Sequence, residues 1–360
     1  MKKAALILTI LLIGFGLMAS GCQKKTEEPP KSTETPAPAP AAQPAPAPAP
    51  GMKIAMVSDV GGVNDQSFNQ SAWEGLQRAQ TELGIKVSYQ ESNNNSDYKP
   101  NLETLRDAGN ALIWSIGFMM GDATLEAAKA NPGQKYAIID MAYGDKTPPN
   151  LIGVVFKAEQ PSFLVGYIAG KMTKTNKVGF VGGIKGFIID AFDYGFHAGV
   201  KTANPKAVIL RQYAESFTDA AKGKSITSQM YQKGADIVFH ASGGVGDGVI
   251  EAAKEKKKWV IGVDKDQNFL APDNVITSAV KRVDNAIFNV AKDLKEGKWA
   301  GGSTISYGLG EGGVDIAPSS SKHVPEAILK EVEALKQKII AGEIVVPFNE
   351  ETYKKFIAAK

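Results

Sequence analysis

Aspartates stand directly after three of the β-type runs in this sequence. Asp59, Asp140 and Asp264 each follow a short apolar run, at the position where a parallel strand would end. Ligand sites of open α/β sheets lie beyond the carboxyl ends of the strands. An ionised carboxylate accepts two hydroxyl or ring N–H donors at once, so these residues suit a neutral, hydroxyl-bearing ring compound. Taken singly, each aspartate fits a helix N-cap or a loop carboxylate equally well.

Aromatic, cationic and glycine residues near these strand ends add to the candidate site. Phe68 offers a stacking platform for a flat base, an interaction of about 1 to 3 kcal/mol per base in nucleic-acid binders. A vicinal diol fits Asp264, and Lys281 could reach the same ligand and offset the local negative charge. The segment that starts at Gly243 (GGVGDG) lacks the spacing of a dinucleotide-binding loop. It either brings the backbone close to a ligand or forms a tight turn before a helix.

The sequence lacks the motifs of common hydrolases and metalloenzymes. It contains neither a G-x-S-x-G nor an H-E-x-x-H pattern, and its three histidines are not spaced as metal ligands. The segment 222–225 (KGKS) ends like a phosphate-binding loop, but Thr218 occupies the place of the first required glycine. We therefore expect no catalytic residue, no metal and no cofactor. The small net charge of +3 and the lack of a basic, aromatic-interleaved face exclude nucleic acid as the expected partner.

The N-terminus has the pattern of an export signal. Two lysines precede an apolar run over residues 4–18, which is shorter than the roughly 20 residues that a membrane-spanning helix needs. Cys22, the only cysteine, follows small residues at the end of this run. The arrangement resembles a bacterial lipobox, which implies a signal peptide over residues 1–21 and acylation of Cys22. An ordinary signal peptide that contains a cysteine is the alternative.

A proline- and alanine-rich stretch separates this signal from the rest of the chain. Residues 22–51 lack the branched and aromatic side chains that a core requires, so we expect a semi-rigid, solvated tether. About 310 residues remain, enough for two domains of ordinary size, and 43% of the whole chain is hydrophobic.

Short β-type runs alternate with longer amphipathic stretches from residue 52 to about 280, which is typical of parallel sheets covered by helices. The rhythm restarts near Phe156 and so indicates two similar lobes. We expect strands at 53–58, 87–90, 111–115, 136–139, 151–156, 178–181, 208–212, 237–239 and 259–263, and helices at 68–83, 122–130, 162–172, 190–203, 219–233 and 249–256.

The last part of the chain is expected to serve both lobes. A strand at 275–280 would cross back to the first lobe, ahead of a helix at 283–294, and a C-terminal helix would cover 324–341. The predicted first lobe therefore comprises residues 52–155 and about 276–310. The predicted second lobe comprises residues 156–275 and about 311–360.

Many segments, in order and with compatible spacing from about residue 53 to 346, resemble the basic membrane lipoprotein family. Its best-known members are purine nucleoside receptors of ABC transporters. The segments that carry the resemblance are 59–70 (DVGGVNDQSFNQ), 73–75 (WEG), 117–118 (GF) with 122–124 (DAT), 136–140 (YAIID), 163–167 (FLVGY), 195–199 (GFHAG), 241–244 (ASGG), 261–266 (IGVDKD) and 278–282 (SAVKR).

The resemblance implies an α/β fold of the two-lobed periplasmic-binding type (type I), with crossovers between the lobes. It also implies roles for residues: Asp59 and Asp140 would hold the base and Phe68 would stack on it. Asp264 would bind the ribose hydroxyls, with Lys281 beside it. The segment 187–192 (FIIDAF) departs from the family pattern at a loop near the cleft. Further ligand contacts are expected from Asn64, Asn69, Phe239 and Gly243.

The sequence thus predicts a monomeric lipoprotein, anchored to the cell membrane through Cys22 and facing the periplasm or the exterior. It would close around a purine nucleoside (adenosine, guanosine or inosine) and deliver it to the permease subunits of an ABC transporter. One rival keeps the fold and binds a sugar, a free base or another furanose. A second is a nucleoside-cleaving enzyme with Asp59 or Asp140 as base, and a third is a surface antigen or adhesin without transport.

Overall fold

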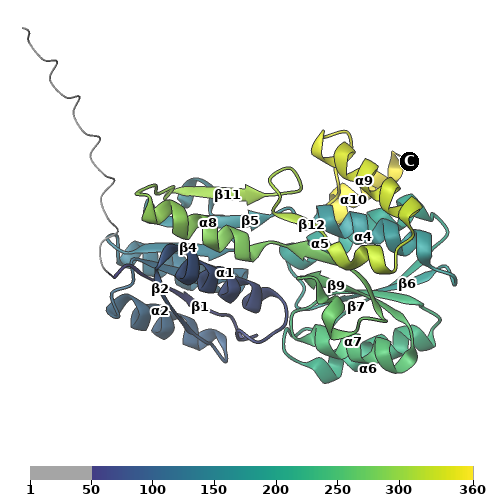
Figure 1. Ribbon diagram of the computed structural model, residues 1–360, viewed down its shortest axis with the longest axis horizontal. Coiled ribbons are helices and arrows are strands. Elements are labelled where there is room, and N and C mark those ends of the chain that lie inside the picture. Colours follow the sequence, from purple (N-terminus) through teal and green to yellow (C-terminus); the bar gives the residue numbers. More distant parts are fainter. Residues whose placement is uncertain (1–50, 360) are drawn as a thin grey trace, which may run out of the picture. The chain divides into compact units, whose positions relative to one another are not determined.

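The computed structural model describes residues 51–359 of the protein. The expected signal peptide and Cys22 lie outside these described residues, as does all of the expected tether except Gly51. Two six-stranded sheets organise the described part of the chain, and we name the first lobe and the second lobe after them (Figure 1).

The first lobe is a parallel sheet between two pairs of helices. Because neighbouring residues of a strand face opposite sides, Ile54 and Met56 pack in one hydrophobic cluster, while Ala55 and Val57 pack in another. In spatial order the strands are β11 (Ser303–Tyr307), β5 (Leu151–Phe156), β4 (Lys135–Ile139), β3 (Leu112–Ile116), β1 (Lys53–Val57) and β2 (Lys86–Gln90). One face is covered by α1 (Phe68–Leu83) and α8 (Val283–Lys295), and the other by α2 (Tyr98–Asp107) and α3 (Gly121–Ala130).

The second lobe repeats this three-layer plan. Its inner strands are nearly continuous buried apolar runs, as expected of a sheet covered on both faces. In spatial order the strands are β12 (Val314–Ile316), β10 (Val275–Lys281), β9 (Trp259–Asp264), β8 (Ile237–Ala241), β6 (Lys177–Gly182) and β7 (Val208–Tyr213), all parallel except β12. One face is covered by α4 (Glu159–Met172) and α5 (Phe187–Ala203), and the other by α6 (Ala220–Gln232) and α7 (Val245–Lys256).

Glycines let α4 and α5 touch through their backbones. A Cβ on Gly166 would lie 2.3 Å from the carbonyl oxygen of Phe196, and a Cβ on Gly199 would lie 2.0 Å from the carbonyl oxygen of Phe163. No larger residue fits such a contact, so the two helices pack as one layer. This packing fixes the position of the first turn of α5, which faces the cleft described below.

The placement of β10 corrects one expectation. The strand expected to return to the first lobe lies instead in the second sheet, between β9 and β12. All seven of its residues are buried, as expected of a strand with neighbours on both sides. The chain crosses back immediately afterwards, because α8 packs on α1 and β11 pairs with β5, before β12 returns to the second sheet.

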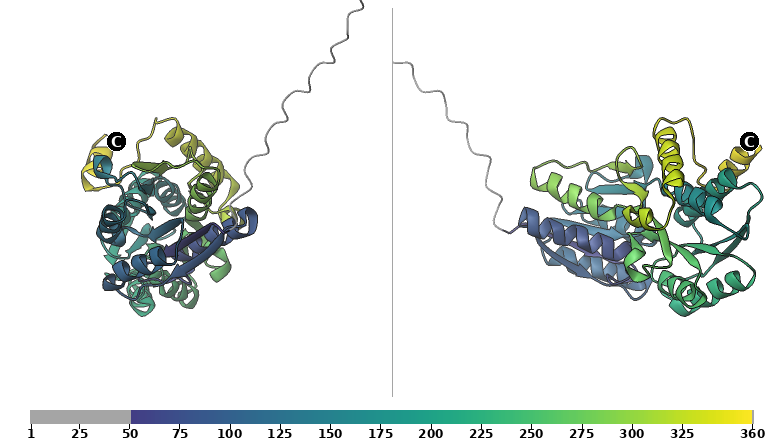
Figure 2. Two further views of the ribbon diagram at one scale, coloured as in Figure 1. Left: turned by 90° about the vertical axis from the view of Figure 1, so that its left-hand side faces the viewer. Right: turned by 45° about the vertical axis from the view of Figure 1, so that its right-hand side comes forward.

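The C-terminal segment covers the second lobe. The helix expected at 324–341 is α9 (Glu326–Ile340), which contacts α4, and a further helix, α10 (Glu350–Ala358), contacts α5 (Figure 2). Among the helices of residues 51–359, none has both the length and the apolar character needed to cross a bilayer. Short 3-10 helices are η1 (Asn95–Asp97), η2 (Phe118–Met120), η3 (Gly144–Lys146), η4 (Gln267–Leu270) and η5 (Pro318–Lys322).

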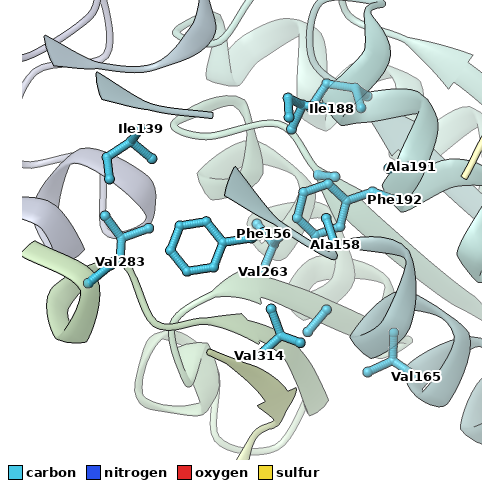
Figure 3. Close-up of a cluster of buried hydrophobic side chains, with 14 of the residues drawn as sticks. Ile139, Phe156, Ala158, Val165, Ile188, Ala191, Phe192, Val263, Val283 and Val314 are labelled. Atoms are coloured by element: carbon cyan, nitrogen blue, oxygen red, sulfur yellow. The ribbon is translucent and has the colours of Figure 1, made fainter. Parts of the chain in front are cut away.

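An apolar junction joins the two lobes beside the crossovers. Ile139 and Phe156 of the first lobe belong to the same hydrophobic cluster as Phe192 and Val263 of the second lobe (Figure 3). The cluster continues into the layer of α1 and α8 in the first lobe and into the layer of α4 and α5 in the second lobe. The lobes therefore share a core on this side. The strand ends that border this junction also form the walls of a cavity.

Candidate functional site

A cavity lies between the lobes, at the carboxyl ends of strands from both sheets. About 550 Å³ of space lies between its walls, part of it open to solvent. The location follows the rule that ligands of parallel α/β sheets bind beyond the strand ends. The lining residues are Asp59, Gly61, Asp65, Phe68, Asn69, Gly117, Phe118, Asp140, Ile188, Ile189, Phe192, Phe217, Ala241, Ser242, Gly243, Val263, Asp264 and Lys281.

The structure brings seven of the nine expected ligand contacts to this cavity and leaves two outside it. Asn64 is exposed and does not line the cavity. Phe239 is fully buried and packs against other aromatic side chains of the second lobe. The seven residues that line the cavity are Asp59, Phe68, Asn69, Asp140, Gly243, Asp264 and Lys281.

Phe239 misses the cavity because it lies within a strand and not beyond its end. It is the third residue of β8, and its ring lies 5.1 Å from that of Phe196 in the covering helix α5. The second lobe contributes two other aromatic side chains to the cavity, Phe192 of α5 and Phe217 of the loop after β7. Phe217 could have been found from the strand expected at 208–212, since it lies in the loop beyond the carboxyl end of that strand.

Two of the site aspartates have an unusual backbone conformation. Asp140 follows β4 with φ of 65°, and Asp264 ends β9 with φ of 63°. Residues other than glycine seldom adopt this left-handed region, although aspartate and asparagine tolerate it better than most. The two lobes therefore use the same device, a left-handed aspartate at the end of a parallel strand, to direct a carboxylate into the cavity.

Lys281 is the only cation among the lining residues that the structure describes, and it lies between aromatic and acidic groups. Its Nζ donates to Oδ2 of Asp140 at 2.6 Å, and both side chains are buried. Nζ also lies 4.4 Å from the ring centroid of Phe68 and 5.5 Å from that of Phe156. These contacts place its charge against two ring faces, where a cation is attracted.

Polar contacts across the cleft hold the lobes together around the cavity. The hydroxyl of Ser67, just before α1 in the first lobe, donates to Oδ2 of Asp264 in the second lobe at 2.5 Å. Nearby, Lys265 pairs with Glu74 of α1 at 2.6 Å. The structure therefore presents the lobes in contact, with Asp264 serving both the lobe contact and the cavity wall.

The start of α1 arranges a second polar group in the first lobe. Asp65 accepts hydrogen bonds from the backbone N–H groups of Ser67, Asn69 and Gln70, which otherwise have no partner at the start of a helix. The side-chain amide of Asn69 donates to Asp59 at 2.8 Å and to Asp65 at 3.1 Å. The amide nitrogen of Asn69 thereby bridges the two carboxylates, and its Oδ1 atom bonds to neither of them.

Burial makes these carboxylates hold protons more tightly than they do in water. It raises the pKa of Asp264 to about 6, although the nearby Lys281 and the hydrogen bond from Ser67 act in the opposite direction. Burial likewise raises the pKa of Asp65 to about 6 and raises the pKa of Asp59. The cavity is thus rich in acceptors, and its full negative charge develops only above the acidic range.

Two buried oxygen atoms of the cavity lining have no hydrogen-bond partner within residues 51–359. They are Oδ1 of Asn69 and Oδ1 of Asp140. A buried acceptor without a donor costs about 1–3 kcal/mol, so each one marks a place where a ligand donor gains free energy. In the same part of the chain, no group of three or more His, Cys, Asp or Glu residues is arranged to hold a metal ion. The arrangement is suited to binding a ligand with several N–H and O–H donors.

Comparison with known proteins gives a consistent family match. The family described as "ABC transporter substrate-binding protein PnrA-like" matches residues 52–350. Basic membrane protein A of Borreliella afzelii is 44% identical over 309 residues, which cover 85% of this chain and 94% of that protein. The CD4+ T-cell-stimulating antigen of Listeria monocytogenes is 44% identical over 315 residues, covering 82% of this chain and 87% of that protein.

Solved structures show the same fold. An ABC transporter solute-binding protein from Aeropyrum pernix K1 superposes with a TM-score of 0.77 at 29% identity, covering 85% of this chain and 96% of that one. An ABC transporter solute-binding protein from Conexibacter woesei gives a TM-score of 0.68 at 25% identity, covering 83% of this chain and 100% of that one. The two-lobed α/β architecture expected from the sequence is confirmed.

Proposed function

This chain belongs to the family of PnrA-like substrate-binding proteins of ABC transporters, and we propose that its ligand is a purine nucleoside such as adenosine, guanosine or inosine. Membership confirms the resemblance drawn from the motifs of the sequence. As a substrate-binding protein the chain captures a small molecule for permease subunits and is not an enzyme. The ligand itself is inferred from the chemistry of the cavity.

The observation that carries the proposal is the excess of acceptors in a cavity that aromatic rings also line. Four carboxylates face one lysine among the described lining residues, and two acceptor atoms of this lining, Oδ1 of Asn69 and Oδ1 of Asp140, lack partners. A nucleoside supplies matching donors, namely ring or exocyclic N–H groups at one end and ribose hydroxyls at the other. Flat aromatic bases also stack on phenylalanine rings. Phe68 of the first lobe and Phe217 of the second lobe provide such rings on the two walls.

We assign the base to the first-lobe end of the cavity. There the unpartnered Oδ1 atoms of Asn69 and Asp140 accept N–H donors, with Asp59 close to Asn69. The ribose lies toward Asp264, whose Oδ2 already accepts from Ser67 while Oδ1 has no hydrogen bond among the described residues. Since the walls belong to different lobes, the ligand enters and leaves by lobe separation, as in other hinge-closing proteins.

The N-terminal features complete the proposal. Cys22 carries lipid after removal of residues 1–21, residues 22–51 tether the binding domain to the cell membrane, and the protein works there as a monomer on the periplasmic or outer side. Mass spectrometry of the membrane fraction should find the mature chain beginning at a lipid-modified Cys22. A Cys22→Ala variant should lose the lipid-modified peptide, and an unmodified Cys22 in the wild-type protein would contradict the anchor.

A thermal-shift panel tests the ligand class. Nucleosides, free bases and sugars in excess are compared, because a ligand that binds only the folded state raises the melting temperature by mass action. We expect purine nucleosides to give the largest increase and sugars none. Stabilisation by a sugar or a free base alone would contradict the proposal, and release of free hypoxanthine from inosine would contradict binding without cleavage.

A further inference from the structure

Three phenylalanines from both lobes meet at the edge of the cavity. We propose that one of them, Phe187, holds this edge closed by packing on Phe118 across the cleft and so sets how long the ligand stays bound. We call Phe118, Phe187 and Phe217 the rim cluster. The inference rests on the proposed function only in requiring a small molecule inside the cavity.

The rim cluster is held by edge-to-face ring contacts. Phe118 lies in η2 of the first lobe, and its ring centroid is 5.5 Å from that of Phe187 with the planes at 65°. The centroid of Phe217 is 6.5 Å from that of Phe118 with the planes at 80°. Such perpendicular arrangements are the favoured ones for aromatic pairs. Phe187 and Phe217 belong to the second lobe, so both contacts cross the cleft.

Phe187 differs from its partners in where it lies. Phe118 and Phe217 line the cavity, and so do Ile188 and Ile189, which follow Phe187 in the first turn of α5. Phe187 does not line the cavity, and 55% of its surface is exposed. It therefore covers the outside of the rim, where it contacts the opposite lobe without occupying ligand space.

Two glycines of the second lobe fix the position of the rim cluster. A Cβ on Gly183 would lie 2.2 Å from the ring of Phe217, so only glycine lets this ring rest on the backbone there. A Cβ on Gly186, the residue before Phe187, would lie 3.7 Å from the ring of Phe118. The backbone at the start of α5 thus sits directly opposite Phe118, which places the ring of Phe187 against it.

These contacts exist only while the lobes are together. None of the three rings lies on a segment that connects the lobes, so opening of the cleft separates Phe118 from Phe187. Ligand release requires that opening, whereas ligand enters the open form of a ligand-free protein that alternates between closed and open lobes. Loss of the Phe187 ring should therefore speed release more than it changes entry, shift the ligand-free protein toward the open form and leave ligand preference nearly unchanged.

The test compares Phe187→Ala with Phe269→Ala, a matched control on η4 of the same lobe whose side chain is 56% exposed. Association and dissociation rates of adenosine are measured by surface plasmon resonance. An edge-to-face pair of average strength predicts that Phe187→Ala raises the dissociation rate about 2- to 12-fold. The association rate should change less than the dissociation rate, Phe187→Tyr should keep the wild-type rates, and Phe269→Ala should match the wild type.

A second background isolates the contact. In a Phe118→Ala protein the further change Phe187→Ala should have no effect on dissociation, because its partner ring is already absent. A dissociation rate of Phe187→Ala equal to that of Phe269→Ala, or an undiminished effect in the Phe118→Ala background, would overturn the proposal.

A ligand-free measurement separates this inference from the nucleoside assignment. If no nucleoside binds the wild-type protein, the proposed ligand is wrong. Small-angle X-ray scattering of the ligand-free variants then tests by itself whether Phe187 holds the two lobes together. Phe187→Ala should have a larger radius of gyration than the wild type, whereas Phe269→Ala should not. Equal radii for all three proteins would show that the rim cluster does not hold the lobes.

Discussion

Nζ of Lys281 and Oδ2 of Asp140 lie 2.6 Å apart and form a buried ion pair that joins the two lobes. Lys281 ends β10 in the second lobe, and Asp140 follows β4 in the first. The second oxygen of Asp140 has no partner within residues 51–359. One oxygen of Asp140 therefore binds the other lobe, and the second oxygen is free to accept a hydrogen bond from a ligand. Ligand binding and lobe closure thus involve the same side chain.

Replacement of Lys281 should destabilise the protein strongly. Lys281→Met leaves the Asp140 carboxylate buried without its cation, a change that typically costs about 3–5 kcal/mol. The free energy of unfolding from urea denaturation measures this loss. The control is Lys298→Met, whose exposed pair with Glu296 should contribute nothing measurable.

A double variant tests the cause of that loss. Lys281→Met combined with Asp140→Asn removes the unpaired charge and should recover part of the stability, because the remaining groups are neutral. A Lys281→Met protein as stable as the wild type would show that the pair is solvated in solution and does not hold the lobes.

Nucleoside affinity should fall in acid because of Asp264. The ionised carboxylate accepts two hydroxyl donors, whereas the protonated form loses part of that capacity. Burial raises the pKa of Asp264 to about 6, so affinity should be constant above about pH 7 and fall below pH 6, by at most about tenfold per pH unit, toward the weaker affinity of the protonated form. Titration calorimetry between pH 5 and pH 8 measures this profile, and Asp264→Asn should lack the part that Asp264 causes.

The ligand-free protein should show the opposite trend. Because the pKa of Asp264 in the folded protein lies above the unfolded value of 3.8, the folded state binds the proton more tightly. This residue therefore adds stability as the pH falls from about 6 toward 4. The wild type should gain stability relative to Asp264→Asn over this range, and parallel stability curves for the two proteins would contradict the raised pKa.

Two phenylalanines of the second lobe should respond in opposite ways to truncation. Phe217→Ala removes a cavity wall and should weaken binding of all purine nucleosides alike, with little loss of stability. Phe239→Ala empties a fully buried site and should cost about 3–5 kcal/mol of folding free energy. Binding and denaturation curves on both variants give the comparison. A Phe239→Ala protein that loses affinity and keeps its stability would place Phe239 in the site after all.

The inner strands were predicted well because a strand buried on both faces consists of a continuous run of apolar residues. All five residues of β3 are buried, and such a run reads as a strand without knowledge of its neighbours. The edge strand β11 (STISY) is largely exposed and polar, so it carried no comparable signal. Helix α2 was also missed, since it begins with a polar stretch and contains Pro100, which a first helical turn tolerates.

Which lobe a strand joins was harder to predict than its presence. β10 is buried along its whole length and would fit the middle of either sheet. The choice depends on where the chain crosses over, which is decided by the packing of α8 on α1 about 200 residues away in sequence. No local pattern contains that information.

The site residues at strand ends could be predicted from the sequence, whereas the site residues on helix α5 could not. Asp59, Asp140 and Asp264 followed directly from the rule for parallel sheets. The wall formed by Ile188 and Ile189 was missed because α5 was expected to begin at Asp190, a residue type that favours helix starts. The helix begins instead after Gly186, where no side chain caps it, and Asp190 lies within its first turn.

In the proposed binding mode, Asp264 accepts hydrogen bonds from the ribose hydroxyls of the nucleoside. Calorimetry with adenosine and 2′,3′-dideoxyadenosine, on the wild type and on Asp264→Asn, tests this contact. Asparagine is the suitable replacement because it tolerates the left-handed backbone at this position. Hydrogen bonds to a charged group predict that the wild type binds the dideoxy ligand about 10- to 100-fold more weakly than adenosine, while the variant distinguishes the two ligands by less than about threefold. Equal affinity of the wild type for both ligands, or the same preference in the variant, would show that Asp264 does not bind the ribose.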